Sequence, residues 1–211
     1  MPVRRPPYEV FWDRFAKLYS LVQEKNNSKL YDEVGAFISK HLGKTHNVLE
    51  IACGTAQITK RCCGSVKFWE ATDFSEKMIE YAGKECLAEN VKFTVANAFD
   101  LPYDDNSFDI VVIANALHII PEPQKALTEI NRVMKKDGLL IAPTFVYDGA
   151  DSAKRVIKIT LMKSMGFKTF SKWTSVQYRE FVEKNGFIVT EQKLFGDEFL
   201  PECVLVCKKG G

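Results

Sequence analysis

Hydrophobic residues are grouped along this chain in short runs, and the segments between the runs carry apolar side chains at helical spacing. Seven of the runs are rich in β-branched or aliphatic residues and have the length of buried strands. Strands that alternate with helices in this way predict an α/β fold, in which a mostly parallel sheet is covered by helices. The predicted strands cover residues 47–52, 66–72, 91–96, 108–114, 139–143, 187–193 and 203–207.

Three of the intervening segments and two segments before the first strand are predicted as helices from their periodicity and their end signals. Ser75 and Thr174 stand where N-cap residues are expected. Asp137-Gly138 and Asn185-Gly186 follow two of the helices and tolerate the left-handed backbone of a helix C-terminus. The predicted helices cover residues 9–24, 28–42, 76–87, 121–136 and 174–184.

Length and composition fit one globular domain over residues 1–211, with 46% hydrophobic and 27% charged residues. The net charge of +2 gives no reason to expect a nucleic acid or an anionic membrane as partner. No stretch approaches the roughly 20 apolar residues of a membrane span, and the N-terminus lacks the apolar core of a signal peptide. We therefore expect a cytoplasmic protein without stable membrane insertion.

The six cysteines are not arranged in the paired spacing of a zinc site. Buried cysteine behaves as a small apolar residue, and thiols stay reduced inside the cell. We therefore predict free thiols and no metal for the cysteines at positions 53, 62, 63, 86, 203 and 207.

The segment around Gly54 carries the most informative pattern of the chain. A buried strand containing Glu50 ends in a turn of small residues, which lets the backbone approach a ligand closely at the carboxyl end of the sheet. Asp73 ends the next strand about 20 residues further on, where an acidic residue in a nucleotide-binding α/β unit accepts hydrogen bonds from both ribose hydroxyls. The alternative is that Asp73 only caps the helix that begins near Ser75.

Four segments follow one another in a recognisable order and spacing. They read VLEIACGT at 48–55, TDFSEKM at 72–78, NAFDLPY and NSFD within 97–109, and EINRVMKKDG at 129–138. Together they resemble the class I methyltransferases that use S-adenosylmethionine, and among these the small-molecule enzymes of the ubiquinone and menaquinone biosynthesis type. The resemblance implies a Rossmann-like three-layer sandwich whose seven-stranded sheet has its last strand antiparallel. It also implies S-adenosyl-L-methionine as cofactor and a small molecule as methyl acceptor.

The resemblance further implies a role for individual positions. Gly54 would allow backbone contact with the cofactor, Asp73 would hold the ribose diol, and Asn97 would face the adenine. Glu50 would act at the methionine and ribose end through the turn, and Asn115 would lie beside the transferred methyl group. The implied cofactor-binding residues are Tyr19, Glu50, Ala52, Cys53, Gly54, Asp73, Phe74, Met78, Asn97, Ala98, Phe99, Asn115 and Ala116.

Three positions depart from the family pattern. The family has glycine where Ala52 and Ala56 stand, and an acidic residue where Asn97 stands. An amide oxygen is a weaker acceptor than a carboxylate. An alanine costs little at negative φ, but about 1 kcal/mol or more where φ is positive. We therefore expect weaker cofactor affinity than is typical of the family.

His118 is the candidate general base, because it lies three residues beyond Asn115 and histidine titrates near neutral pH. A structural histidine bonded to the backbone is the alternative. Tyr19 is the second catalytic candidate. It belongs to an aromatic stripe in the N-terminal helices, which are expected to cover the cofactor site within residues 1–45, and its ring could contact the sulfonium.

Residues 146–173 follow the fifth strand and carry six basic residues against two acidic ones. Their position suits a substrate lid. The basic residues are best explained as a solvated helical face, with attraction of an acidic or phosphorylated acceptor as the alternative. A nucleic-acid substrate is not expected, because residues 114–117 read ANAL rather than an Asn-Pro-Pro-Tyr type of signature. The oligomeric state is left open.

Two other functions are alternatives to methyl transfer. A nicotinamide dehydrogenase needs the GxGxxG fingerprint, and residues 52–57 supply only Gly54. A non-catalytic module that binds S-adenosylmethionine is favoured by the altered glycine positions and by the absence of an obvious base.

Overall fold

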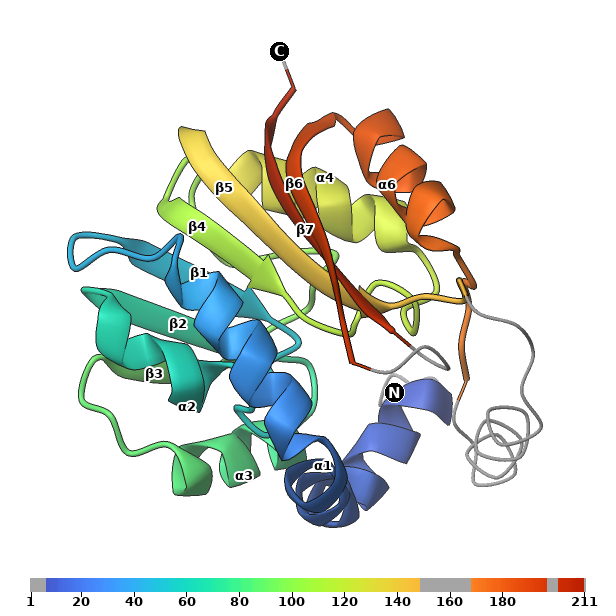
Figure 1. Cartoon of the computed structure of the whole chain (residues 1–211). Helices are drawn as coiled ribbons and strands as arrows, with labels where there is room; N and C mark the ends of the chain where they lie inside the picture. The colour runs from blue at the N-terminus through green and yellow to red at the C-terminus, as the bar shows by residue number, and fades with distance from the viewer. Residues whose placement is uncertain (1–6, 149–167, 197–200, 211) are drawn as a thin grey trace, which may run out of the picture.

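The computed structural model describes residues 7–148, 168–196 and 201–210, and within the first helix it describes the side chains of residues 11–13, 16 and 27 onward. Seven strands form one sheet in the order β3-β2-β1-β4-β5-β7-β6 (Figure 1). Strands β1 to β5 pair in parallel, and β7 runs antiparallel to both of its neighbours. The predicted sheet with its antiparallel last strand is confirmed. The strands are β1 (Asn47–Ile51), β2 (Phe68–Asp73), β3 (Val91–Val95), β4 (Phe108–Ile113), β5 (Met134–Phe145), β6 (Phe187–Phe195) and β7 (Glu202–Lys209).

Helices cover both faces of the sheet, which gives the three layers (Figure 1). One face carries α1 (Pro7–Ser39), α2 (Thr59–Cys62), the short 3-10 helix η1 (Cys63–Ser65) and α3 (Glu76–Glu85). The other face carries α4 (Pro123–Val133) and α6 (Ser175–Lys184).

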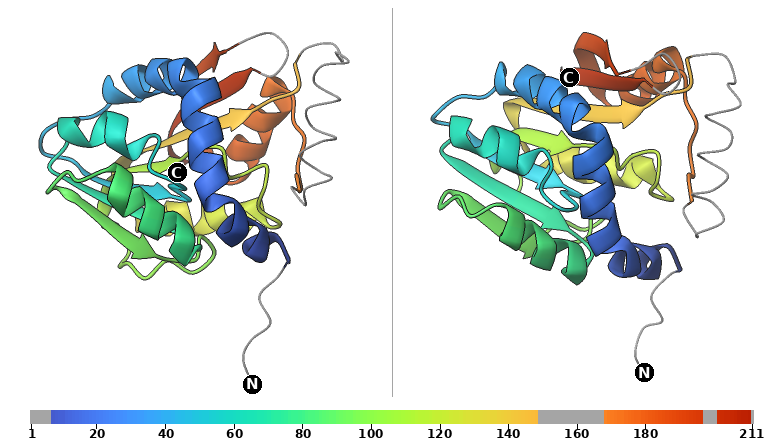
Figure 2. Two further views of the ribbon diagram at one scale, coloured as in Figure 1. Left: turned by 90° about the horizontal axis from the view of Figure 1, so that it is seen from below. Right: turned by 60° about the horizontal axis from the view of Figure 1, so that its bottom comes forward.

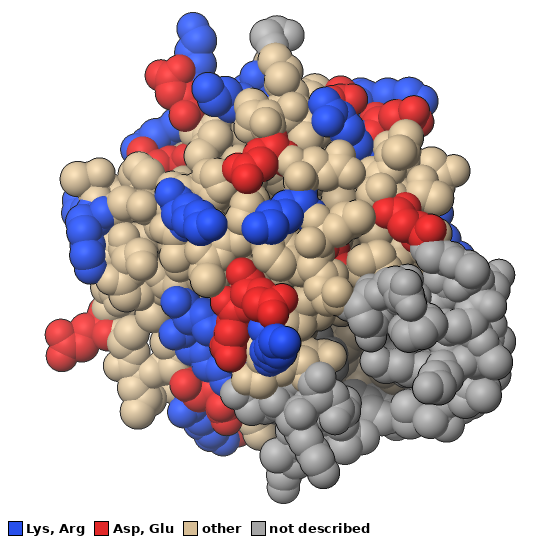
Figure 3. All heavy atoms as spheres, viewed as in Figure 1, with Lys and Arg blue, Asp and Glu red and all other residues tan. Residues whose placement is uncertain are grey.

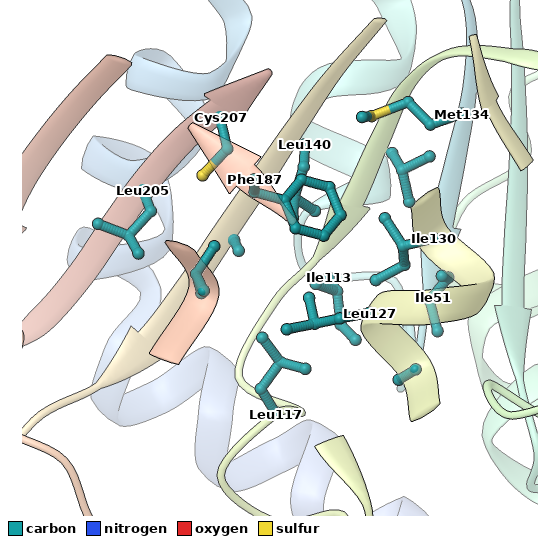
Figure 4. Close-up of a cluster of buried hydrophobic side chains, with 14 of the residues drawn as sticks. Ile51, Ile113, Leu117, Leu127, Ile130, Met134, Leu140, Phe187, Leu205 and Cys207 are labelled. Carbon is teal, nitrogen blue, oxygen red and sulfur yellow. The ribbon is translucent and has the colours of Figure 1, made fainter. Parts of the chain in front are cut away.

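The hydrophobic core is divided by the sheet into two halves, of which Figure 4 shows the one under α4 and α6. In β7, Leu205 packs in that half, whereas its neighbours Val204 and Val206 pack in the half under α1. Successive strand residues point to opposite faces, so a strand buried on both sides is apolar at most of its positions. This explains the continuous apolar runs from which the strands were predicted.

The N-terminal region forms one helix rather than the two predicted over residues 9–24 and 28–42. Helix α1 continues through Asn26, Asn27 and Ser28, and Figure 2 shows that its axis bends. The prediction was wrong because these polar residues favour helix ends without enforcing one, and the segment contains no glycine or proline to interrupt the backbone hydrogen bonds.

The helix predicted over residues 121–136 ends earlier than expected. Helix α4 stops at Val133, and β5 begins directly at Met134, which pairs with Phe108. Gly138 therefore lies inside a strand and does not adopt the left-handed helix end that we expected, whereas Gly186 does so with φ +88°. Backbone pairing in the sheet outweighs the helical tendency of Met134, Lys135 and Lys136.

Most of the segment predicted as a substrate lid lies outside the described residues. Within residues 168–173, the backbone N–H groups of Phe170 and Ser171 donate to the His118 carbonyl oxygen at 2.9 and 3.2 Å. Trp173 stacks on Phe181 of α6, with ring centroids 4.7 Å apart. The end of this segment is thus attached to the loop after β4 and to α6.

Of the helices in the described residues, none combines the length and apolar character required to traverse a bilayer.

Candidate functional site

A cavity lies at the edge of the sheet where the parallel strands end, which is where ligands bind in open α/β sheets. Its lining is mainly apolar or small, with Asp73, Asn97 and Asn115 as polar members. Ten of the thirteen residues implied as cofactor-binding lie in this lining. The lining residues are Trp12, Ile51, Ala52, Gly54, Asp73, Phe74, Met78, Ala96, Asn97, Ala98, Phe99, Ala114, Asn115, Ala116, Ile119, Ile120 and Pro121.

The turn after β1 has a left-handed backbone at three positions. Ala52, Gly54 and Ala56 have φ values of 56°, 54° and 63°. Glycine adopts this conformation freely, whereas the Cβ of an alanine crowds the following carbonyl oxygen. Both alanines therefore have the positive φ at which an alanine costs about 1 kcal/mol or more. Cys53 lies between them, buried and outside the cavity lining.

Replacing Ala52 by glycine should raise the free energy of unfolding by about 0.5–1 kcal/mol, since relief of strain exceeds the entropy that glycine adds to the unfolded chain. Ala52 is the better test position because Ala56 is fully buried and would also lose apolar contacts. Urea unfolding of both proteins measures the difference. The matched control is Ala82→Gly in α3, which should destabilise by about 1 kcal/mol or more. A destabilised Ala52→Gly variant would contradict the assignment of strain.

Asp73 connects the end of β2 to the turn after β1. Its Oδ2 accepts a hydrogen bond from the Gly54 backbone N–H at 3.0 Å, and its Oδ1 accepts one from the Ser75 N–H at 2.9 Å. Ser75 itself caps α3 by accepting from the Met78 N–H at 3.1 Å. A carboxylate has about four lone-pair positions, so each Asp73 oxygen retains capacity for a ligand. Burial raises the pKa of Asp73 to about 6, so the group is ionised at neutral pH.

Glu50 lies beneath the turn and does not line the cavity. Its Oε2 accepts hydrogen bonds from the Thr59 hydroxyl at 2.5 Å and from the Trp69 indole N–H at 3.0 Å. Burial raises the pKa of Glu50 to about 7 despite these bonds. Any influence of Glu50 on a ligand is therefore exerted through the turn, as the family resemblance implied, and its assignment stays a prediction.

Buried carboxyl groups should make the ligand-free protein less stable as pH rises. Glu50 and Glu202 each have a pKa raised by burial from 4.5 to about 7. The folded state then holds protons that the unfolded state releases, so the stability present below pH 4.5 is lost as pH rises through about 7. Each group contributes about 3 kcal/mol to this loss.

The test is the urea concentration at the midpoint of unfolding, which should decrease as the pH is raised from about 5.5 to 7.5. Glu80→Gln is the control, because exposed Glu80 has a pKa lowered to about 2 by Lys77 and Lys84 and does not titrate in this window. A midpoint that rises between pH 6.5 and about 7.5 would exclude neutral buried carboxyls, whereas below pH 6.5 the lowered pKa of buried His118 acts in the opposite direction.

Asn97 lines the cavity together with Ala98 and Phe99, directly after β3. Its Oδ1 accepts a hydrogen bond from the Phe99 backbone N–H at 2.9 Å. This bond fixes the amide orientation and leaves one further lone pair on the oxygen. The assignment of Asn97, Ala98 and Phe99 to the adenine stays a prediction.

Asn115 follows β4 and adopts a left-handed conformation with φ 53°. Its Nδ2 donates to Oε1 of Glu202 at 3.1 Å, across 87 positions of sequence. Sequence reasoning missed Glu202. A detectable signal was present, since β7 is otherwise apolar as far as Cys207 and begins with this single acid. An antiparallel last strand begins where the parallel strands end, so this acid had to lie at the ligand-binding edge.

His118 is buried and does not line the cavity. Its Nδ1 lies 2.8 Å from the Thr144 hydroxyl, and burial lowers its pKa to about 4. The imidazole is therefore neutral and held inside the protein. Its role as a base stays a prediction.

The side chain of Tyr19 lies outside the described residues. Trp12, from the same N-terminal helix, lines the cavity. The cation–π contact of Tyr19 with a bound sulfonium stays a prediction.

Comparisons with known proteins agree with this geometry. Residues 49–142 match the methyltransferase domain family. The demethylmenaquinone methyltransferase of Staphylococcus aureus (strain MRSA252) is 38% identical over 136 residues, which are 56% of this chain and 56% of the relative. The chain thus spans little more than half the length of that relative.

The fold is shared more widely. A chain of the complex between the Haloferax volcanii Trm112 methyltransferase activator and a methyltransferase superposes with a TM-score of 0.79 at 17% identity, over 97% of this chain and 98% of the other. The [4+2]-cyclase SpnF superposes with a TM-score of 0.69 at 18% identity, over 85% and 81%. The fold alone therefore does not decide the reaction. The segment 49–142, which carries the motifs, is similar to the methyltransferase domain family and to demethylmenaquinone methyltransferases.

Proposed function

We propose that this protein transfers the methyl group of S-adenosylmethionine to a small-molecule acceptor. The observation that carries the proposal is the convergence of Asp73, the left-handed turn and Asn97 on one cavity. Around the sheet edge the turn after β1, Asp73 of β2 and Asn97 after β3 follow one another, and an aminocarboxylate, a ribose and an adenine would lie against them in that order.

Within the proposal, the cofactor supplies an electrophilic methyl group on a sulfonium. Asp73 would accept the hydrogen bonds of the ribose diol, while Phe74 and Met78 would pack against the nucleoside. Asn97 and Phe99 would enclose the adenine, and Ala116 would lie beside the methyl group. The task of the protein is then to align the acceptor with the methyl carbon and to exclude water.

A small acceptor is supported by two observations. The Staphylococcus aureus relative is a demethylmenaquinone methyltransferase, a name that indicates a quinone substrate. On the face drawn in Figure 3, basic side chains are interspersed with acidic ones, whereas a nucleic acid favours a continuous basic surface.

A non-catalytic module that binds the same cofactor is the second candidate. The strained alanines and the buried, neutral His118 favour it, since both weaken the case for a fully functional site. It predicts binding of S-adenosylmethionine without methyl transfer.

Calorimetric titration with S-adenosylmethionine, S-adenosylhomocysteine and NAD tests the proposal. We expect binding of the first two with affinity weaker than low nanomolar and no binding of NAD. Transfer of tritiated methyl to a panel of quinols, phenols, amines and thiols then separates the enzyme from the binding module. Absence of binding of both sulfur nucleosides would overturn the proposed function.

A further inference from the structure

A buried polar pair, Asn115 and Glu202, lies beside the cavity, and the cofactor assignments above leave Glu202 without a role. Asn115 lines the cavity, and Glu202 begins β7 in register with Phe145 of β5 and Phe195 of β6. Glu202 has no solvent-exposed surface. Its carboxyl is therefore built into the sheet edge on the β5 and β7 side of the cavity, away from the nucleoside positions on β2 and β3.

Both members of the pair have an unused oxygen. Asn115 Nδ2 donates to Glu202 Oε1, so the carboxyl fixes the amide and turns Asn115 Oδ1 away from itself. Asn115 Oδ1 and Glu202 Oε2 are buried and have no hydrogen-bond partner among the described residues. Buried polar atoms are almost always satisfied in native proteins, so two unsatisfied acceptors on one bonded pair point to a ligand that supplies donors.

We propose that Asn115 and Glu202 form the recognition site for the O–H or N–H group of the methyl acceptor, with Asn115 Oδ1 and Glu202 Oε2 as the two acceptor atoms. The inference rests on the proposed function. Ile119, Ile120 and Pro121 line the same cavity and provide an apolar surface for the ring or chain that carries this group. An acceptor whose heteroatom is already fully alkylated has no donor and is not recognised.

Glu202→Gln separates this role from a structural one. The carbonyl oxygen of the introduced amide can still accept from Asn115 Nδ2, and the side chain keeps its shape. The amide N–H group of the glutamine then replaces Oε2, so the O–H or N–H group of the ligand would face another donor instead of an acceptor. Burial raises the pKa of Glu202 to about 7. The measurements are therefore made at about pH 8, where the carboxyl is mostly ionised and can only accept.

The experiment measures binding of phenol, aniline, anisole and toluene to the protein saturated with S-adenosylhomocysteine. The wild type should bind phenol or aniline at least about fivefold more tightly than anisole or toluene, since a buried acceptor left unpaired is costly. Glu202→Gln should reduce this preference to about twofold or less, with the affinity for S-adenosylhomocysteine changed less than about threefold. The matched control is Glu70→Gln, which changes a buried carboxyl outside the cavity and should keep the preference.

Asn115→Gly is the second variant, because glycine accepts the positive φ and removes the amide. It should also lose the preference, and it covers the case in which Glu202→Gln does not fold. Equal binding of phenol and anisole by the wild type, no binding of any donor probe, or a preference that survives in the variants overturns the inference. Failure of the wild type to bind S-adenosylhomocysteine is a different result and counts against the proposed function itself.

Discussion

Asp73→Asn is expected to weaken the binding of S-adenosylhomocysteine about 100-fold or more. Asp73 accepts hydrogen bonds from Gly54 and Ser75 and, in the proposed complex, from two ribose hydroxyls. An amide in its place turns one acceptor atom into a donor that faces either a backbone N–H or a hydroxyl. Hydrogen bonds to charged groups contribute about 1.5–3 kcal/mol each, and every 1.4 kcal/mol changes affinity about tenfold.

Calorimetric titration measures this change, and thermal unfolding shows whether the variant stays folded. The control is Glu70→Gln on the same strand. Glu70 is also a buried carboxyl, but it accepts from Thr94 and Tyr103 and does not line the cavity. Its replacement should change the affinity less than about twofold. A folded Asp73→Asn protein with wild-type affinity would favour the alternative raised from the sequence, in which Asp73 only supports the start of α3.

Gly138→Ala is expected to destabilise the protein by about 2–3 kcal/mol, a typical effect of overpacking in a well-packed region. A Cβ atom at this position would lie 2.7 Å from Met134 Cγ, 2.9 Å from the Asp109 carbonyl oxygen and 3.0 Å from the Lys135 carbonyl oxygen. Two of these contacts are with backbone, which cannot rotate away. The strand register between β4 and β5 shifts here, between Phe108 and Ile110, so relief would require the sheet to move.

Urea unfolding quantifies the effect. The matched control is Gly83→Ala in α3, where a Cβ atom finds its nearest neighbour, Phe93 Cδ2, at 4.0 Å. Alanine is the better helix former, so this control should stabilise the protein by about 0.5–1 kcal/mol. If the Gly138→Ala protein proved as stable as the wild type, the close approach of the Asp109 and Lys135 carbonyl oxygens to position 138 would be wrong.

The sheet was predictable because its strands are buried on both faces, and such burial leaves a continuous apolar run in the sequence. Apart from β5, each strand differs from its predicted range by at most two residues at either end. The position of Asp73 was also predictable, because it lies between the end of a predicted strand and the start of a predicted helix, and this places it at the edge of the sheet. The N-cap role of Ser75 follows from the same local chemistry.

Other features depend on contacts that are distant in sequence. Met134 is helix-forming by local tendency and becomes a strand residue only because Phe108 pairs with it. His118 is suitable as a base by spacing, but its burial against Thr144 depends on the path of β5. The partnership of Asn115 with Glu202 requires knowledge of which strand lies beside β5, and local periodicity does not contain that information.

The position of β7 also bears on the order in which the molecule can be assembled. The last strand of the chain inserts between β5 and β6, so neither of these strands has its final neighbour until residues 202–209 are available. During synthesis from the N-terminus, β1 to β4 can associate first, while β5 keeps an open hydrogen-bonding edge. Nascent chains that end before Pro201 would present that edge to one another, and aggregation of such fragments is the hazard that this topology carries.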